Sequence, residues 1–167
     1  LRSRVQTAKD LRARGEAEQR QNKIAEAVAS YEASLKLVPD QALTDHVNLL
    51  KTQLAKGDEK KQSADRLWQE GTNLFNQGRP SDALTKFKES LTHVQDATRA
   101  KYVQDLEARR TQAQALREEG ARLQQQGKLQ DAVTKYNQSL QVWPDPALRE
   151  HVAKIEAEIR KQGTQVA

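Results

Sequence analysis

The chain has no cysteine and no methionine, and aromatic residues make up only 4% of its 167 positions. The absence of cysteine excludes disulfide bonds, thiol catalysis and metal sites built on cysteine. It leaves the compartment open, because such a chain suits the cytoplasm as well as a bacterial extracytoplasmic space. Since the chain begins at Leu1 and lacks methionine, we expect it to be a segment of a larger protein.

Long hydrophobic runs are also missing. No run approaches the roughly 20 residues that a membrane-spanning helix needs, and no signal peptide is present. Hydrophobic residues make up 36% of the chain and charged residues 31%. The hydrophobic residues recur at spacings of three and four, which predicts amphipathic helices that each bury one stripe and expose the rest to solvent.

The net charge of +5 is spread along the chain and not gathered in one patch. The internal basic doublets, Lys60-Lys61 and Arg109-Arg110, have acidic residues nearby. The most basic stretch is residues 1–15, where five Lys or Arg residues accompany only Asp10. Mixed charge of this kind is typical of solvated helix faces. Nucleic-acid binding through the first helix is therefore the least favoured function.

One pattern of residues occurs three times along the chain. Each copy has a glycine, followed in the same order and at the same spacing by an alanine, an aromatic residue and a serine. The copies are Gly15, Ala27, Tyr31, Ser34; Gly71, Ala83, Phe87, Ser90; and Gly120, Ala132, Tyr136, Ser139. The periodicity predicts a pair of helices in each copy, over 5–21 and 24–37 in the first.

A third helix belongs to each copy. An aspartate, a valine and a leucine or isoleucine follow at positions that keep the same spacing from the glycine in all three copies. They are Asp40, Val47, Leu50; Asp96, Val103, Leu106; and Asp145, Val152, Ile155. Aspartate is a favoured N-cap, and the two apolar positions mark a buried face. The sequence therefore predicts three units of three helices each, over 1–57, 58–112 and 113–167, with a frayed tail from residue 163.

The two junctions between units differ. Between residues 97 and 126 there is no proline, and the only glycine is Gly120. We therefore expect the third helix of unit two to run unbroken into the first helix of unit three. The first junction is longer by seven residues, which is close to two helical turns, so a continuous helix would keep its phase there. We favour the alternative, in which Gly57 ends the helix.

The first two helices of each unit resemble tetratricopeptide repeats (TPRs), whose pattern has glycine in the first helix and alanine, an aromatic and a small residue in the second. The resemblance implies an all-α, right-handed array that binds protein or peptide partners. The spacing is longer than that of ordinary TPRs, because each unit has an extra helix. A three-helix unit is also similar to the microtubule-interacting and transport domain, which is the alternative family.

No catalytic or metal-binding pattern is present, and we expect no enzymatic activity and no cofactor. His46, His93 and His151 are too scattered to form a metal triad. His46 and His151 occupy the same place in the third helix, where Tyr102 stands in unit two. That equivalence favours a partly buried packing role for both histidines.

A candidate partner-binding surface lies on the first helix of each unit. In TPRs this face lines the concave groove, and the matching positions here are Arg12 and Gln19, Trp68 and Phe75, and Arg117 and Gln124. Trp68 and Phe75 are either an apolar anchor for a partner or residues that pack beneath the third helix. Trp143 is expected to cap the second helix of unit three against the third.

The sequence thus predicts a non-catalytic scaffold for protein–protein interaction. The alternative is a purely structural spacer or self-association module, similar to tandem bundles of the microtubule-interacting and transport type.

Overall fold

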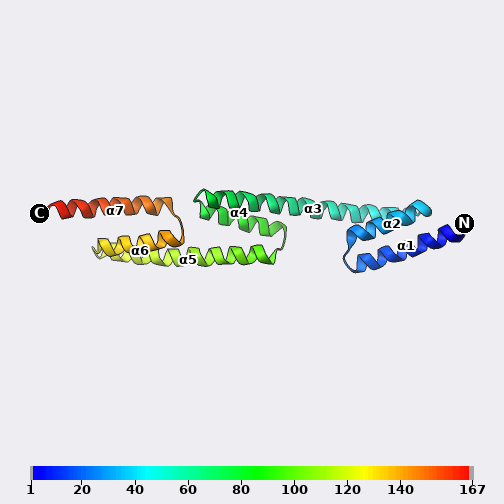
Figure 1. Cartoon of the computed structure of the whole chain (residues 1–167), viewed down its shortest axis with the longest axis horizontal. Helices are drawn as coiled ribbons and strands as arrows, with labels where there is room; N and C mark the ends of the chain where they lie inside the picture. The colour runs from blue at the N-terminus through cyan, green and yellow to red at the C-terminus, as the bar shows by residue number, and fades with distance from the viewer. Residues whose placement is uncertain (1, 166–167) are drawn as a thin grey trace. The chain divides into compact units, whose positions relative to one another are not determined.

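The computed structural model describes residues 2–165 and the side chains of residues 3–162, and within this range the chain forms seven α-helices and no strand (Figure 1). The helices are α1 (Arg2–Arg20), α2 (Ile24–Leu37), α3 (Gln41–Asn76), α4 (Pro80–His93), α5 (Ala97–Gln125), α6 (Leu129–Val142) and α7 (Pro146–Gln165). The expected all-α fold is confirmed. In the described range, none of these helices combines the length and the hydrophobicity needed to cross a membrane.

The helices group into two compact units, Leu1–Gln62 and Ser63–Ala167. The first unit holds α1, α2 and the N-terminal part of α3, and the second holds the rest of α3 together with α4 to α7. Two of the three copies of the sequence pattern therefore lie in the second unit. We call the pairs α1–α2, α3–α4 and α5–α6 the first, second and third hairpins.

A left-handed residue reverses the chain between the two helices of each hairpin. The residues are Asn22 (φ 61°), Gly78 (φ 74°) and Gly127 (φ 74°). The next N–H then donates to a carbonyl five residues back, in the bonds Lys23–Glu18 (2.9 Å), Arg79–Leu74 (3.0 Å) and Lys128–Leu123 (3.0 Å). This pattern of bonds satisfies carbonyls that a helix end leaves free.

In each hairpin a glycine of the first helix lies against an aromatic ring of the second. A Cβ atom placed on the glycine would lie 2.7 Å from two ring atoms in all three pairs, Gly15–Tyr31, Gly71–Phe87 and Gly120–Tyr136. The rings are at most 3% exposed, so they have little room to move away. Glycine stands at these positions because only its backbone lets the ring lie so close.

A buried serine hydroxyl fastens the same helices together. It donates to a backbone carbonyl of the preceding helix in the bonds Ser34–Ala8 (2.8 Å), Ser90–Ala64 (2.8 Å) and Ser139–Ala113 (2.7 Å). A small side chain at this position leaves room for the neighbouring backbone, and its hydroxyl finds a partner without water. Among the described residues, no buried side-chain nitrogen or oxygen lacks a hydrogen bond.

The predicted aspartate caps are confirmed at the start of α3, α5 and α7. A carboxylate oxygen accepts the N–H three residues later in the bonds Asp40–Leu43 (3.0 Å), Asp96–Arg99 (2.9 Å) and Asp145–Leu148 (3.0 Å). Each aspartate satisfies one of the N–H groups that have no partner inside the helix. The helix that follows then lays its apolar face on the hairpin.

Each copy of the pattern has its own hydrophobic core. In the first, α2 packs on α3 through Ala27, Val28, Tyr31, Leu43, Val47 and Leu50. In the second, α4 packs on α5 through Ala83, Leu84, Phe87, Val103, Leu106 and Ala113. In the third, α6 packs on α7 through Ala132, Tyr136, Leu148, Val152 and Ile155.

Both junction helices are continuous. Helix α5 runs unbroken from Ala97 to Gln125, as expected. The prediction that Gly57 ends a helix is wrong, because α3 continues through it to Asn76. A single glycine costs a helix interior only about 1 kcal/mol relative to alanine, and buried Leu50 and Ala64 hold the helix on either side.

Two further expectations concern the C-terminal tail and Trp143, and the second needs correction. The fraying expected from residue 163 stays a prediction: α7 continues to Gln165, and residues 166–167 lie outside the described range. Trp143 caps α6 only through its backbone N–H, which donates to Ser139 (2.9 Å). Its side chain packs into the core of α4 and α5 and not against α7, and its Nε1 donates to Ser81 Oγ (3.4 Å). The ring fills the space where the end of α6 meets the start of α4.

We predict that Gly71→Ala lowers the free energy of unfolding of the second unit by about 1–3 kcal/mol, because the new methyl group overpacks the Phe87 ring. Gly57→Ala is the matched control, since a Cβ there meets nothing within 4 Å. Urea denaturation followed by circular dichroism measures both. Equal stability of the two variants would show that the Phe87 ring does not lie against Gly71.

Candidate functional site

The structure places each predicted surface position beside the aromatic ring or the capping aspartate of its own copy. Gln19 and Gln124 reach the rings of Tyr31 and Tyr136. Arg12 and Arg117 reach the capping carboxylates of α3 and α7. In the second copy Trp68 and Phe75 pack against the core that contains Phe87. The three sites are thus equivalent in position, and the second differs from the other two in chemistry.

A glutamine bridges two rings in the first copy. Gln19 Oε1 accepts a hydrogen bond from the Tyr31 hydroxyl (3.0 Å) and lies 2.9 Å from His46 Nε2. The imidazole meets the phenol ring edge-on, with the ring centroids 5.6 Å apart. Burial raises the pKa of Tyr31, so its hydroxyl stays protonated and donates.

The third copy repeats this arrangement. Gln124 Oε1 accepts from the Tyr136 hydroxyl (2.8 Å) and lies 3.0 Å from His151 Nε2. The centroids of the two rings are 5.5 Å apart, and burial raises the pKa of Tyr136. Each histidine thus packs edge-on against its tyrosine and takes part in a polar bridge, but only His46 is partly buried as expected, whereas His151 is exposed.

In the first and third copies an arginine forms an ion pair with the capping aspartate. Arg12 Nη1 lies 3.0 Å from Asp40 Oδ2, and Arg117 Nη1 lies 3.1 Å from Asp145 Oδ2. The Leu43 N–H, and to a smaller degree the Arg12 guanidinium, hold the pKa of Asp40 below its ordinary value. The arginines thus tie the first helix of a hairpin to the start of the third helix.

The second copy replaces the whole polar set with aromatic rings. Phe75 stands in place of the bridging glutamine, Phe87 in place of the tyrosine and Tyr102 in place of the histidine, while Trp68 takes the place of the arginine. The ring centroids of Trp68 and Phe87 are 4.5 Å apart, and those of Phe87 and Tyr102 are 5.5 Å apart. The rings meet at a tilt or edge-on, which are favourable aromatic geometries.

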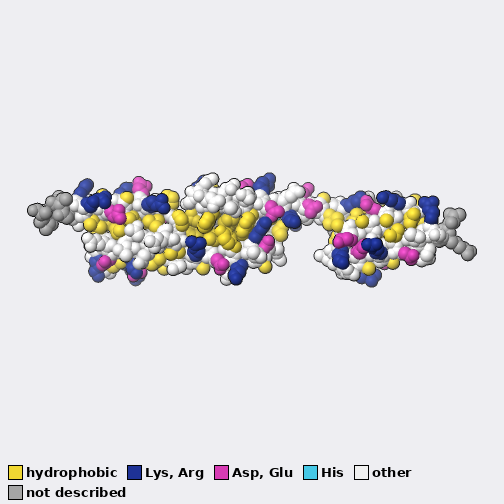
Figure 2. Space-filling view, in the orientation of Figure 1, with side chains coloured by type: hydrophobic (Ala, Val, Ile, Leu, Met, Phe, Trp, Pro, Cys, Tyr) yellow, Lys and Arg dark blue, Asp and Glu magenta, His cyan; other side chains and the backbone are white. Residues whose placement is uncertain are grey.

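These rings surround a hollow of about 190 Å³. Its lining consists of Trp68, Thr72, Phe75, Asn76, Phe87 and Tyr102. We call it the aromatic hollow. Tyr102 is 41% exposed, although it is a large hydrophobic residue. Figure 2 shows hydrophobic side chains gathered over α4 and α5 on the face drawn.

Arg99 does not line the hollow, but its side chain lies against the Trp68 ring. Leucine occupies its position in the other two copies, at Leu43 and Leu148. The Arg99 guanidinium lies 5.0 Å from the centroid of the Trp68 ring, and it is paired with Asp65 and Asp96. A cation over an indole face is attractive, and it holds the ring in place.

Trp68 and Phe75 are half-buried, and Trp68 contacts Tyr102 of α5 at a centroid distance of 5.7 Å. They therefore do pack beneath the third helix of their own copy, as one of the two interpretations held. Their use as an anchor for a partner stays a prediction. The rings remain accessible through the hollow.

Two parts of the site were not foreseen from the sequence. The polar bridge was missed because glutamine carries no strong structural preference. The sequence does hold a signal for the bridge, because the positions of Gln19, Tyr31 and His46 are all occupied by other, aromatic residues in the second copy. The role of Arg99 was missed because a charged residue stands where leucine is expected.

A larger cleft, of about 390 Å³, lies beside Trp143 and is a weaker candidate. Its lining includes Arg110, Arg117, Glu118 and Asp145. Charges of both signs line it, and Arg117 and Asp145 already pair with each other. Within the described residues, no group of three His, Asp or Glu side chains is arranged to hold a metal ion.

We predict that Gln124→Ala lowers the free energy of unfolding by about 1 kcal/mol, because the Tyr136 hydroxyl loses its acceptor. Exposed Gln125→Ala on the same helix is the control. Combining Gln124→Ala with Tyr136→Phe in a double-mutant cycle isolates the bond. Additive effects of the two substitutions would contradict the bridge.

We also predict that Asp40 makes stability depend on pH. The pKa of Asp40 in the folded protein lies below the ordinary value of about 3.9. Asp40 therefore stabilises the fold fully at pH values above about 3.9, and this stabilisation is lost as the pH falls through the folded-state pKa. Asp40→Asn keeps a capping oxygen but cannot titrate. Urea denaturation should show a smaller loss of stability between pH 6 and pH 3 in this variant, whereas the same loss in both proteins would refute the contribution.

No known protein family matches this sequence, and no curated protein matches it at a significant level.

Proposed function

We propose that the chain is a non-catalytic protein–protein interaction scaffold, built as a right-handed array of three TPR-like three-helix units. The proposal of an array rests on contacts that recur in every copy: glycine against a ring, serine on a carbonyl and aspartate at a helix start. Units with the same internal contacts and shared helices fit the stacking of a repeat protein.

The aromatic hollow is the observation that carries the binding proposal. At about 190 Å³ it is smaller than the roughly 300–1,000 Å³ of small-molecule pockets. It is suited to one bulky apolar side chain presented by a partner peptide. Aromatic and arginine side chains dominate the energetics of such interfaces, and here Trp68, Tyr102 and Arg99 stand together.

The surrounding helices pre-organise this site. Phe87 is 1% exposed and is held by Gly71 behind it, and Arg99 fixes Trp68 from the other side. A site whose side chains are already ordered has little conformational entropy to lose on binding. The ordering cost then falls on the partner peptide.

The alternative function is a structural spacer or self-association module. It is favoured by the internal use of the polar candidate residues, since Arg12, Gln19, Arg117 and Gln124 all bond within the chain. Nucleic-acid binding by α1 is supported less, because Arg12, Arg14 and Arg20 all lie near Glu16 or Glu18.

A triple substitution tests the proposal with a set of core residues that the chain already uses in its first and third copies. Phe75→Gln, Phe87→Tyr and Tyr102→His together give the second copy the polar bridge of the first and third. We predict that this variant keeps its helicity, because the same three residue types already pack together in the first and third copies. Peptides selected on the unmodified protein from a random display library should bind it at least ten-fold more weakly.

The matched control is the reverse exchange in the third copy, Gln124→Phe, Tyr136→Phe and His151→Tyr. It changes as many residues and leaves the aromatic hollow intact, so the selected peptides should bind it unchanged. Fluorescence anisotropy measures all three affinities. Equal binding to the unmodified protein and the second-copy variant would overturn the proposal. A selection that yields no peptide dependent on the aromatic hollow would also overturn it, and is the result expected of a spacer.

A further inference from the structure

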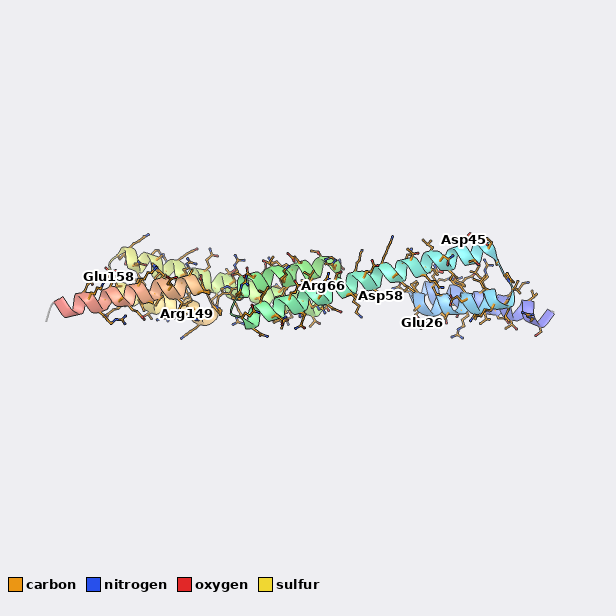
Figure 3. All side chains as sticks on the ribbon, turned by 90° about the horizontal axis from the view of Figure 1, so that it is seen from above. Glu26, Asp45, Asp58, Arg66, Arg149 and Glu158 are labelled. Atoms are coloured by element: carbon orange, nitrogen blue, oxygen red, sulfur yellow. The ribbon has the colours of Figure 1, made fainter. Side chains whose placement is uncertain are left out.

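One stretch of α3 has no tertiary support. All eight residues from Ala55 to Gln62 are exposed. The nearest buried residues on the helix, Leu50 and Ala64, are 14 positions apart. A Cβ atom at Gly57 would meet nothing within 4 Å. Asp58, labelled in Figure 3, projects from this stretch, and its side chain is exposed.

The matching stretch of α5 is anchored. Its flanking buried residues, Leu106 and Ala113, are only seven positions apart, which is close to two helical turns. Between them, Arg109 Nη2 donates to the Val142 carbonyl (3.4 Å), and Glu107 pairs with Lys88 of α4. The extra seven residues of α3 therefore insert two turns of helix that bury no side chain.

Only backbone hydrogen bonds hold such a stretch in helical form. Short helices without packing are marginal in water, and Gly57 lowers the helical preference further. Regions with few buried contacts and exposed backbone bonds open at a much lower free energy than the core. The division between the two compact units falls at the end of this stretch, between Gln62 and Ser63.

We infer that α3 opens locally between Ala55 and Gln62 while both compact units stay folded. The helix is therefore a joint that melts and re-forms, and α5 contains no such joint. Opening exposes no buried side chain, because none lies within the stretch. The inference does not depend on the proposed binding function, and its failure would leave the aromatic hollow untouched.

Limited proteolysis of the full chain by trypsin tests the inference with a control inside the molecule. Lys56, Lys60 and Lys61 lie in the joint, and Arg109 and Arg110 lie at the matching place in α5, all with exposed side chains. Cleavage needs local unfolding, and its rate follows the open population when the helix recloses quickly. We expect cutting in the joint to be at least ten-fold faster than at Arg109 or Arg110, as read by mass spectrometry of early time points.

Gly57→Ala and Gly57→Pro complete the test. Alanine should slow cleavage in the joint about five-fold, because it favours the helix over the open form. Proline blocks trypsin at Lys56, the residue before it, but should speed cleavage after Lys60 and Lys61, because it breaks the helix. Neither variant should alter the rate at Arg109 or Arg110. Similar rates in α3 and α5, or a rate in the joint that ignores the residue at position 57, would overturn the inference.

Discussion

The contact between a helix glycine and a buried aromatic ring is the constraint on which each hairpin depends. Because no side chain separates the backbone from the ring, the two helices come close enough for a serine hydroxyl to reach the carbonyl opposite. The ring in turn presents its far side to the helix that follows. Four features therefore depend on one another: the left-handed turn residue, the glycine against the ring, the serine hydrogen bond and the aspartate cap. They occur together three times, with the same spacing in each copy.

What varies is the group placed against the ring. In the first and third copies a glutamine joins a tyrosine to a histidine, and an arginine pairs with the capping aspartate. In the second copy aromatic residues stand at the glutamine, tyrosine, histidine and arginine positions, and the capping aspartate pairs with Arg99. Substitutions that change together keep the site satisfied, because a lone polar group against an apolar ring would lack its partner. This exchange within a constant set of contacts is the reason why we propose the second copy as the site for an apolar partner.

Much of the helix pattern could be predicted from the sequence. The spacing of Tyr31, Phe87 and Tyr136 from their glycines predicts the hairpins, and the aspartates predict the helix starts, because both signals are local. Gly57 was misjudged because the packing of Leu50 and Ala64 outweighs one unfavourable residue. Trp143 was misjudged because its side chain contacts Ser81, which is far away in the sequence, and no local pattern reports such a contact. The polar bridges could not be predicted, because each one joins side chains from three helices whose relative positions the sequence pattern does not give.

Proton–proton nuclear Overhauser effects test the central contact most directly. The Hα protons of Gly15, Gly71 and Gly120 should each give strong cross-peaks to the ring protons of the aromatic residue in the next helix of the same hairpin. Gly57, which has no side chain near it, should give none to any ring. Cross-peaks in all three pairs are the predicted result. Their absence from any one pair in the folded protein would contradict a frame shared by the three copies.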